Sequence, residues 1–200
     1  MNRRGIGIRL TCLYVLAAAS PAFAAPEGDW PCIQPRVVTL GVAQMWSGPP
    51  LDQAFARWRD DAEVAGLVRS LVPRRVTMDE AAAAIDRFAA AAGPQKTEKL
   101  TLLFAGLFEI INADRQRLVG GIERYARRQR ALSEDIGETA RTLSDASIPA
   151  SQREAIEERL RWDRRIYDER NQSLIYVCET PVILEQRAFG LAREIARHLE

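Results

Sequence analysis

The sequence predicts an all-α protein, in which a small helical bundle carries a long antiparallel, coiled-coil-like helical hairpin. Three observations lead to this prediction. β-branched residues gather in one short run only, residues 36–42. Apolar residues recur at spacings of three and four over long stretches, which is the period of one helix face. Two stretches of about fifty residues, 95–146 and 149–200, have a single proline in their interiors, Pro181.

The first 24 residues have the organisation of a secretory signal peptide. Arg3 and Arg4 precede a short apolar run at 10–19, and Ala22-Phe23-Ala24 is a small-x-small cleavage site. The apolar run has about ten residues, whereas a membrane-spanning helix needs about twenty. We therefore expect cleavage after Ala24, no membrane span in the mature protein, and a periplasmic or secreted location.

The mature chain is almost electrically neutral. Removal of the signal leaves 176 residues with 25 basic and 27 acidic side chains, so the net charge is about −2. This length is sufficient for one domain with its own core. Binding of nucleic acid or of an anionic membrane relies on an excess of positive charge. We therefore expect no nucleic acid partner.

Cys32 and Cys178 are the two cysteines of the mature chain. Two thiols in an exported protein usually pair, so we predict a disulfide; the alternative is two separate, buried thiols. A redox-active role is disfavoured because the sequence has no C-x-x-C motif. The bond would hold an extended N-terminal arm, residues 25–49, which Pro31 and Pro35 stiffen.

Two shorter helices are predicted at the start of a single helical domain that spans residues 50–200. Helical spacing of apolar residues indicates the first helix over 50–72, with an irregularity near its middle. The second helix covers 78–92, where Thr77 and Glu80 form a capping box at its start. Both helices are available to cover the first long helix.

The turn at 144–151 is short, so the two long helices are antiparallel neighbours. In this register, the numbers of two opposite residues add up to about 297. Residues 100–111 are apolar at nine of twelve positions and need cover on several sides. Residues 123–170 instead contain eleven Arg and eleven acidic residues around one apolar seam. We predict a bundle of residues 50–122 and 171–200, and a charged stalk of residues 123–170.

Both long helices are weakened at the same level. Gly120 and Gly121 each cost a helix about 0.8–1 kcal/mol relative to Ala. The register places them opposite residues 176–177, next to Cys178 and to Pro181, which should kink the second helix. We hypothesise that the arm lies along this level and that Trp30 fills the space beside the glycines.

The sequence lacks the usual patterns for metals, haem and nucleophilic catalysis. It has no C-x-x-C-H for covalent haem and no E-x-x-H of the di-iron bundles. The sole histidine, His198, would have to serve in any Ser-His-Asp or Cys-His arrangement. We therefore expect no cofactor, no metal site and no catalytic residues.

Glu109 lies inside the apolar run and faces residues 185–187 in the predicted register. Paired with Glu185 in an apolar setting, it would have a raised pKa and could act as half of an acid–base pair. The interpretation that we favour is an ion pair with Arg187 or Arg193, or a partly exposed edge position.

Arginine clusters at 124–130 and 159–165 are of the kind that binds RNA. The same stretch has an equal number of acids, which favours a solvated network of ion pairs. Trp162 is the residue that fits a solvated face least. It either caps the apolar seam or contacts a partner.

These features favour a non-enzymatic, exported scaffold, adaptor or accessory protein that presents its stalk to a protein partner. The alternative is a small-molecule-binding protein or hydrolase. Its pocket would lie at the junction of bundle and stalk, lined by Glu109, Asn112, Tyr176 and Glu179. A protein that lies on a membrane through its apolar base is disfavoured, because Glu109 interrupts the apolar run and two helices are available to cover it.

Overall fold

The computed structural model describes residues 30–199, and this part of the chain is helical with no strand. The predicted all-α fold is therefore confirmed. The predicted signal peptide and the first residues of the arm lie outside the described residues. The elements in chain order are η1 (Val42–Gln44), α1 (Asp52–Arg57), α2 (Ala62–Leu71), α3 (Met78–Ala91), η2 (Gly93–Gln95), α4 (Lys96–Ser144) and α5 (Ala150–Ala196).

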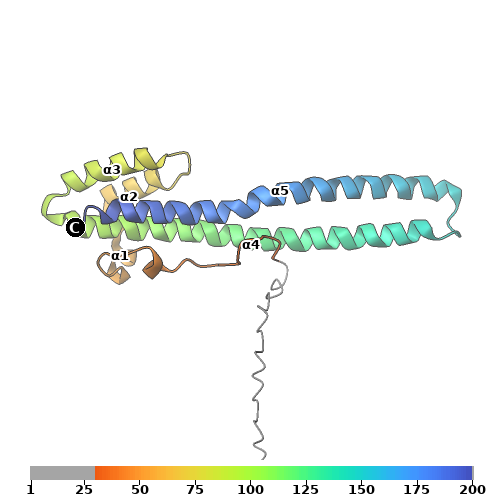
Figure 1. Ribbon diagram of the computed structural model, residues 1–200, viewed down its shortest axis with the longest axis horizontal. Helices are drawn as coiled ribbons and strands as arrows, with labels where there is room; N and C mark the ends of the chain where they lie inside the picture. The colour runs from red at the N-terminus through yellow and green to blue at the C-terminus, as the bar shows by residue number, and fades with distance from the viewer. Residues whose placement is uncertain (1–29, 200) are drawn as a thin grey trace, which may run out of the picture.

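Helices α4 and α5 form a long antiparallel hairpin that runs the length of the molecule (Figure 1). Two hydrogen bonds between them agree with the predicted register. Gln129 Nε2 donates to the carbonyl oxygen of Tyr167 at 3.1 Å, and Arg115 Nε donates to that of Pro181 at 3.3 Å. The knobs-into-holes packing of a coiled coil stays a prediction.

The stretch predicted as one helix over 50–72 is two helices, α1 and α2. The break occurs because Asp61 caps the start of α2. Its carboxylate accepts the backbone N–H groups of Glu63 and Val64, each at 3.0 Å. Asp is among the best N-cap residues, and its backbone here is extended instead of helical.

Helix α3 begins and ends as predicted. Thr77 Oγ1 accepts the N–H of Glu80 at 3.2 Å, while the Glu80 carboxylate accepts the N–H of Thr77 at 2.8 Å. Gly93 follows the helix with a φ of +53°, a conformation that glycine adopts without steric cost. The chain then turns directly into α4.

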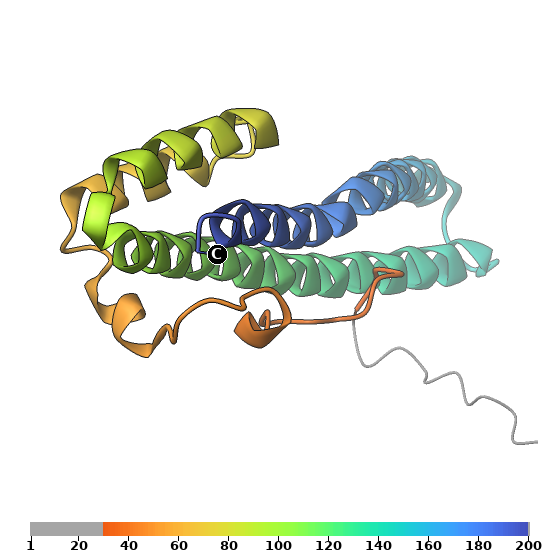
Figure 2. The ribbon, with the colours of Figure 1, turned by 60° about the vertical axis from the view of Figure 1, so that its left-hand side comes forward.

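The three short helices cover one end of the hairpin, with α2 and α3 on one side and α1 on the other (Figures 1 and 2). We call this end the base: α1 to α3 with residues 96–118 and 184–199. Residues 100–108 are all buried there, as an apolar run without a polar face requires. Helix α4 packs tightly against the short helices at Gly106, where a Cβ atom would lie 2.8 Å from the ring of Trp58 and from the side chain of Val68 in α2.

The buried guanidinium of Arg187 holds the loop between α2 and α3 in place. Its Nε and Nη2 donate to the carbonyl oxygen of Leu71 at 3.2 and 2.5 Å, and Nη1 donates to that of Val76 at 2.8 Å. Leu71 ends α2, so the guanidinium lies at the negative end of that helix dipole. Burial lowers the pKa of Arg187 from its ordinary value.

The stalk, residues 123–170, extends beyond the short helices (Figure 1). Only Gln129 and Leu160 are buried in it. The hypothesis that Trp30 fills the space beside Gly120 and Gly121 is wrong. Cβ atoms built at these glycines would meet the side chain of Arg124, at 3.3 and 3.9 Å, and no atom of the arm.

None of the helices in residues 30–199 combines the length and the apolar character that crossing a membrane requires.

Candidate functional site at the arm and the outer face of α5

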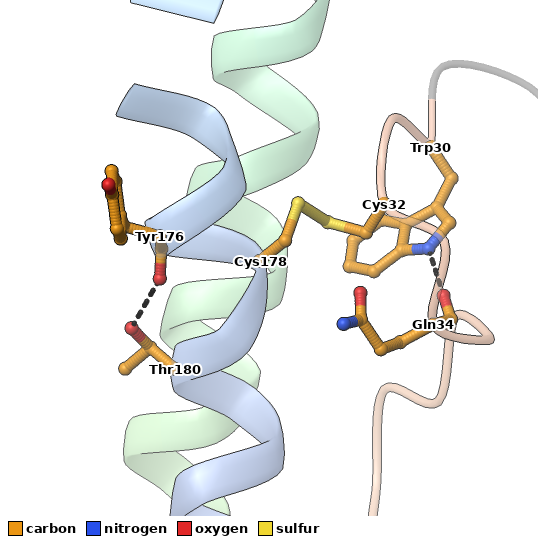
Figure 3. The surroundings of a disulfide bond; sticks show 6 residues. All are labelled: Trp30, Cys32, Gln34, Tyr176, Cys178 and Thr180. Carbon is orange, nitrogen blue, oxygen red and sulfur yellow. Dashed lines mark hydrogen bonds between the residues drawn. A yellow bond between two sulfur atoms is a disulfide. The ribbon is translucent and has the colours of Figure 1, made fainter. Parts of the chain in front are cut away.

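The predicted disulfide between Cys32 and Cys178 is present and ties the arm to α5 (Figure 3). Cys178 is buried with Ile122 and Leu174, and Trp30 packs against this cluster. The two cysteines are 146 residues apart in the sequence. In the chain-entropy model, a bond that closes a loop of this length lowers the entropy of the unfolded chain. It thereby stabilises the folded state by at most about 5 kcal/mol.

A tight turn shapes the arm around the disulfide. The indole Nε1 of Trp30 donates to the backbone carbonyl of Gln34 at 2.7 Å, which closes residues 30–34 into one loop (Figure 3). The Gln34 side chain lies beside the Trp30 ring, with its amide turned toward the helices. Its Oε1 atom is buried and accepts no hydrogen bond from the described residues 30–199.

Beyond this turn, the arm is fastened to α4 by polar contacts at four positions between residues 36 and 40. Asn112 Oδ1 accepts the backbone N–H of Leu40 at 3.0 Å, so Asn112 anchors the arm. The other contacts are the ion pair of Arg36 with Glu123, the bond from Arg115 Nη1 to the carbonyl of Val37, and the 3.3 Å bond from Gln116 Nε2 to Thr39 Oγ1.

Arg115 is the central residue of this site, and sequence reasoning missed it. Its side chain is 4% exposed. It makes three bonds to two segments: one to the arm at Val37, and two to α5, at the Pro181 carbonyl and at the carboxylate of Glu185, 3.3 Å from Nη2. A signal was available, because Arg115 follows Ile111 by four residues and therefore shares its apolar stripe.

Two hollows of about 480 Å³ each flank the disulfide, and Gln34 lines both. We call the first the outer groove; it lies between Ile33 on the arm and the stretch of α5 around Ile175. We call the second the arm cavity; it lies between the arm and both long helices, next to Arg115. Their volumes fall in the range of small-molecule sites, roughly 300–1,000 Å³.

Glu109 lies in the base, away from both hollows. Its Oε2 accepts the indole N–H of Trp58 at 2.8 Å, and its Oε1 lies 2.5 Å from Arg59 Nη2. These bonds from Arg59 and Trp58 lower the pKa of Glu109 below its ordinary value. The hypothesis of a raised pKa and an acid–base pair is therefore wrong, and the ion-pair partner is Arg59 instead of Arg187 or Arg193.

The remaining predicted site residues are distributed over separate places. Glu179 lines the outer groove. Tyr176 points to the side of α5 opposite the arm (Figure 3) and is 75% exposed. Trp162 is 57% exposed on the stalk, with the guanidinium carbon of Arg165 5.7 Å from its ring centre. The structure thus does not bring Glu109, Asn112, Tyr176 and Glu179 into one pocket.

Tyr176 and Trp162 share one stripe along the outer face of α5. Trp162, Tyr176 and Ile183 are separated by multiples of seven residues, which places them on the same side of a helix. All three are exposed. We call these three residues the outer stripe.

Within residues 30–199, no three His, Cys, Asp or Glu side chains gather in a way that would hold a metal ion. Comparison of the chain with models of known protein families, with curated proteins and with solved structures gives no match. The functional argument therefore rests on the geometry of the arm and of α5.

Proposed function

We propose that the protein is an exported, non-enzymatic helical scaffold or adaptor that binds a protein partner through the outer stripe of α5, which begins at Trp162 on the stalk and continues beyond it. The observation that carries this proposal is the exposure of Trp162, Tyr176 and Ile183 on one face of a long hairpin. Trp and Tyr supply much of the binding energy at protein interfaces, where their large rings are buried on association.

The surroundings of the outer stripe support an interface that is apolar in its centre and charged at its rim. Arg165 lies beside Trp162, and its charge is drawn to the face of the indole ring. Further charged residues of α5 flank the stripe on the stalk, among them Arg161 and Asp168. Charged rims of this kind steer partners and select among them.

The export part of the proposal rests on the disulfide and on the predicted signal peptide. Disulfides persist in oxidising compartments such as the periplasm or the extracellular space. The bond between Cys32 and Cys178 also holds the arm on the side of α5 opposite Tyr176. The three residues of the outer stripe stay exposed.

The test is capture of partners from periplasmic extract on the immobilised mature protein. The double variant Trp162→Ala/Tyr176→Ala removes the two aromatic rings of the outer stripe. The matched control, Ile33→Ala/Val38→Ala, removes two exposed apolar side chains of the arm. We expect a partner that the wild type and the control retain and the stripe variant loses. Identical captured sets for all three proteins would contradict the proposal.

A further inference from the structure

The arm cavity has the form of a ligand site that is separate from the outer stripe. Its volume is about 480 Å³, and the arm, α4 and α5 each contribute to its walls. Apolar side chains make up most of the lining: Trp30, Val37, Val119, Pro181, Val182 and Phe189. A cavity with such walls favours an apolar ligand over water.

One acceptor in the wall has no partner. Gln34 Oε1 is buried, yet no donor within residues 30–199 reaches it. Leaving a buried polar atom without a hydrogen bond is costly, so such atoms are rare in folded proteins. Because Gln34 lines the arm cavity, a turn of its amide toward a ligand there would let an N–H or O–H group of that ligand supply the missing donor.

The charges in the wall are already matched. Arg115 is buried and paired with Glu185 at 3.3 Å, and both residues line the arm cavity. The bonds of Arg115 to Val37, Pro181 and Glu185 use three of the five N–H groups of its guanidinium. A carboxylate ligand would meet the charge of Glu185, and an ammonium ligand would meet that of Arg115. An uncharged ligand avoids both repulsions and the cost of burying an unmatched charge.

We propose that the arm cavity binds a small, uncharged, apolar molecule whose head group donates a hydrogen bond to Gln34 Oε1, such as a primary amide with an alkyl chain. The alkyl chain lies against the apolar walls. The amide carbonyl takes one of the N–H groups that Arg115 leaves unused. The disulfide keeps the arm in place over the ligand, which gives the clamped arm a function of its own.

The first test compares three probes with similar chains on the mature, oxidised protein by titration calorimetry. Octanamide is neutral and carries a donor, octanoate is an anion, and octylammonium is a cation. We expect saturable binding of octanamide that is about tenfold tighter than that of either charged probe. Equal binding of all three probes, or no saturable heat with octanamide because the cavity holds water only, would overturn the proposal.

Two substitutions, each with a control, test whether octanamide binds in the arm cavity. Gln34→Leu removes the buried acceptor, and Gln44→Leu is its control on an exposed part of the arm. Val182→Phe fills the arm cavity, and Val177→Phe adds the same bulk at an exposed position of α5 outside its lining. We expect octanamide to bind about tenfold more weakly to Gln34→Leu and Val182→Phe, and unchanged to the two controls. Unchanged binding to both cavity variants would place the probe elsewhere and refute the site.

The variant Glu185→Gln tests the charge argument in the opposite direction. It leaves the guanidinium of Arg115 without its counter-charge, so octanoate should bind about tenfold more tightly than it does to the wild type. Circular dichroism and limited proteolysis confirm that the arm of each variant is still folded and attached. A variant that keeps its arm but shows no change in preference would contradict the role of the Arg115–Glu185 pair.

Discussion

The base and the stalk are built from the same two helices, yet they are held together in different ways. In the base, the three short helices and α5 bury residues 100–108. In the stalk, residues 123–170, the two helices pack on each other, the arm is attached at Glu123, and Gln129 and Leu160 are the buried residues. The change in packing occurs where Arg115 and the disulfide attach the arm.

This difference has a consequence for how each region tolerates change. Burial of apolar area supplies most of the stability of a domain, so the base should determine whether the protein folds. The stalk buries little, so its surface can carry Trp162, the first residue of the outer stripe, at small cost to folding.

Truncation of a core residue in the base should have the largest effect. Phe104 is fully buried, and its ring stacks on that of Trp46 with the centroids 4.2 Å apart. We expect Phe104→Ala to lower the free energy of unfolding by about 3–5 kcal/mol. Ile136→Ala is the matched truncation in the half-buried seam of the stalk and should cost about 1 kcal/mol. Urea unfolding followed by circular dichroism measures both; equal losses would mean that the stalk is packed like the base.

Removal of the disulfide should have an intermediate effect and should release the arm rather than unfold the base. We expect Cys32→Ser to cost about 2–4 kcal/mol, and to make the arm sensitive to limited proteolysis while the helical signal is retained. Counting free thiols in the unfolded, unreduced wild type checks the bond itself. Two free thiols there would contradict the disulfide, and loss of the helical signal in the variant would show that the arm is part of the core.

The ion pair of Glu109 should make a small, pH-dependent contribution to the base. Arg59 and Trp58 lower the pKa of the Glu109 carboxyl group from the ordinary 4.5. The stabilisation by the ion pair is therefore present above pH 4.5 and is lost as the pH falls through the folded-state pKa. The side chain of Glu109 is 37% exposed, and screening by water limits the effect to less than about 1 kcal/mol.

Unfolding of the wild type and of Glu109→Gln at pH 7 and pH 3 measures this contribution. The difference in stability between the two proteins should shrink at pH 3. Glu98→Gln removes a more exposed partner of an ion pair on the same helix and serves as the control. An increase of the Glu109→Gln difference at low pH would contradict the direction of the shift.

Shortening the stalk should have the smallest effect on stability. Residues 126–132 and 165–171 lie opposite each other in the register, and their removal deletes both partners of the bond between Gln129 and Tyr167. We expect the thermal midpoint to change by only a few degrees, because no contact of the base is lost. Removal of 126–132 alone shifts the register and should destabilise the hairpin. Early melting of the matched deletion would show that the stalk contributes to the core.

The sequence was sufficient to predict the helical fold, the hairpin register, the capping box at Thr77 and the disulfide. Each of these follows from residues that are close in sequence or from a simple count of cysteines. The break between α1 and α2 was predicted only as an irregularity within one helix, because the cap at Asp61 interrupts a helical period that continues on both sides.

The contents of the site were harder to predict. Arg115 and Arg187 both bond backbone carbonyls of distant loops. Because every residue has a carbonyl, no side-chain pattern identifies these acceptors before the chain is folded. Trp162 was recognised because an exposed aromatic residue stands out among charges. Tyr176 and Ile183 lie on the same face of the helix as Trp162, and this follows from their spacing in the sequence.

Small-angle X-ray scattering of the mature protein tests whether the stalk projects from a compact base. A compact globule of 176 residues has a radius of gyration of about 16 Å. The 49 residues of α4 alone extend over about 74 Å. We therefore predict a radius of gyration well above 16 Å, which decreases when residues 126–132 and 165–171 are removed. A value close to 16 Å for the intact protein would mean that the hairpin folds back on the base and would contradict the account.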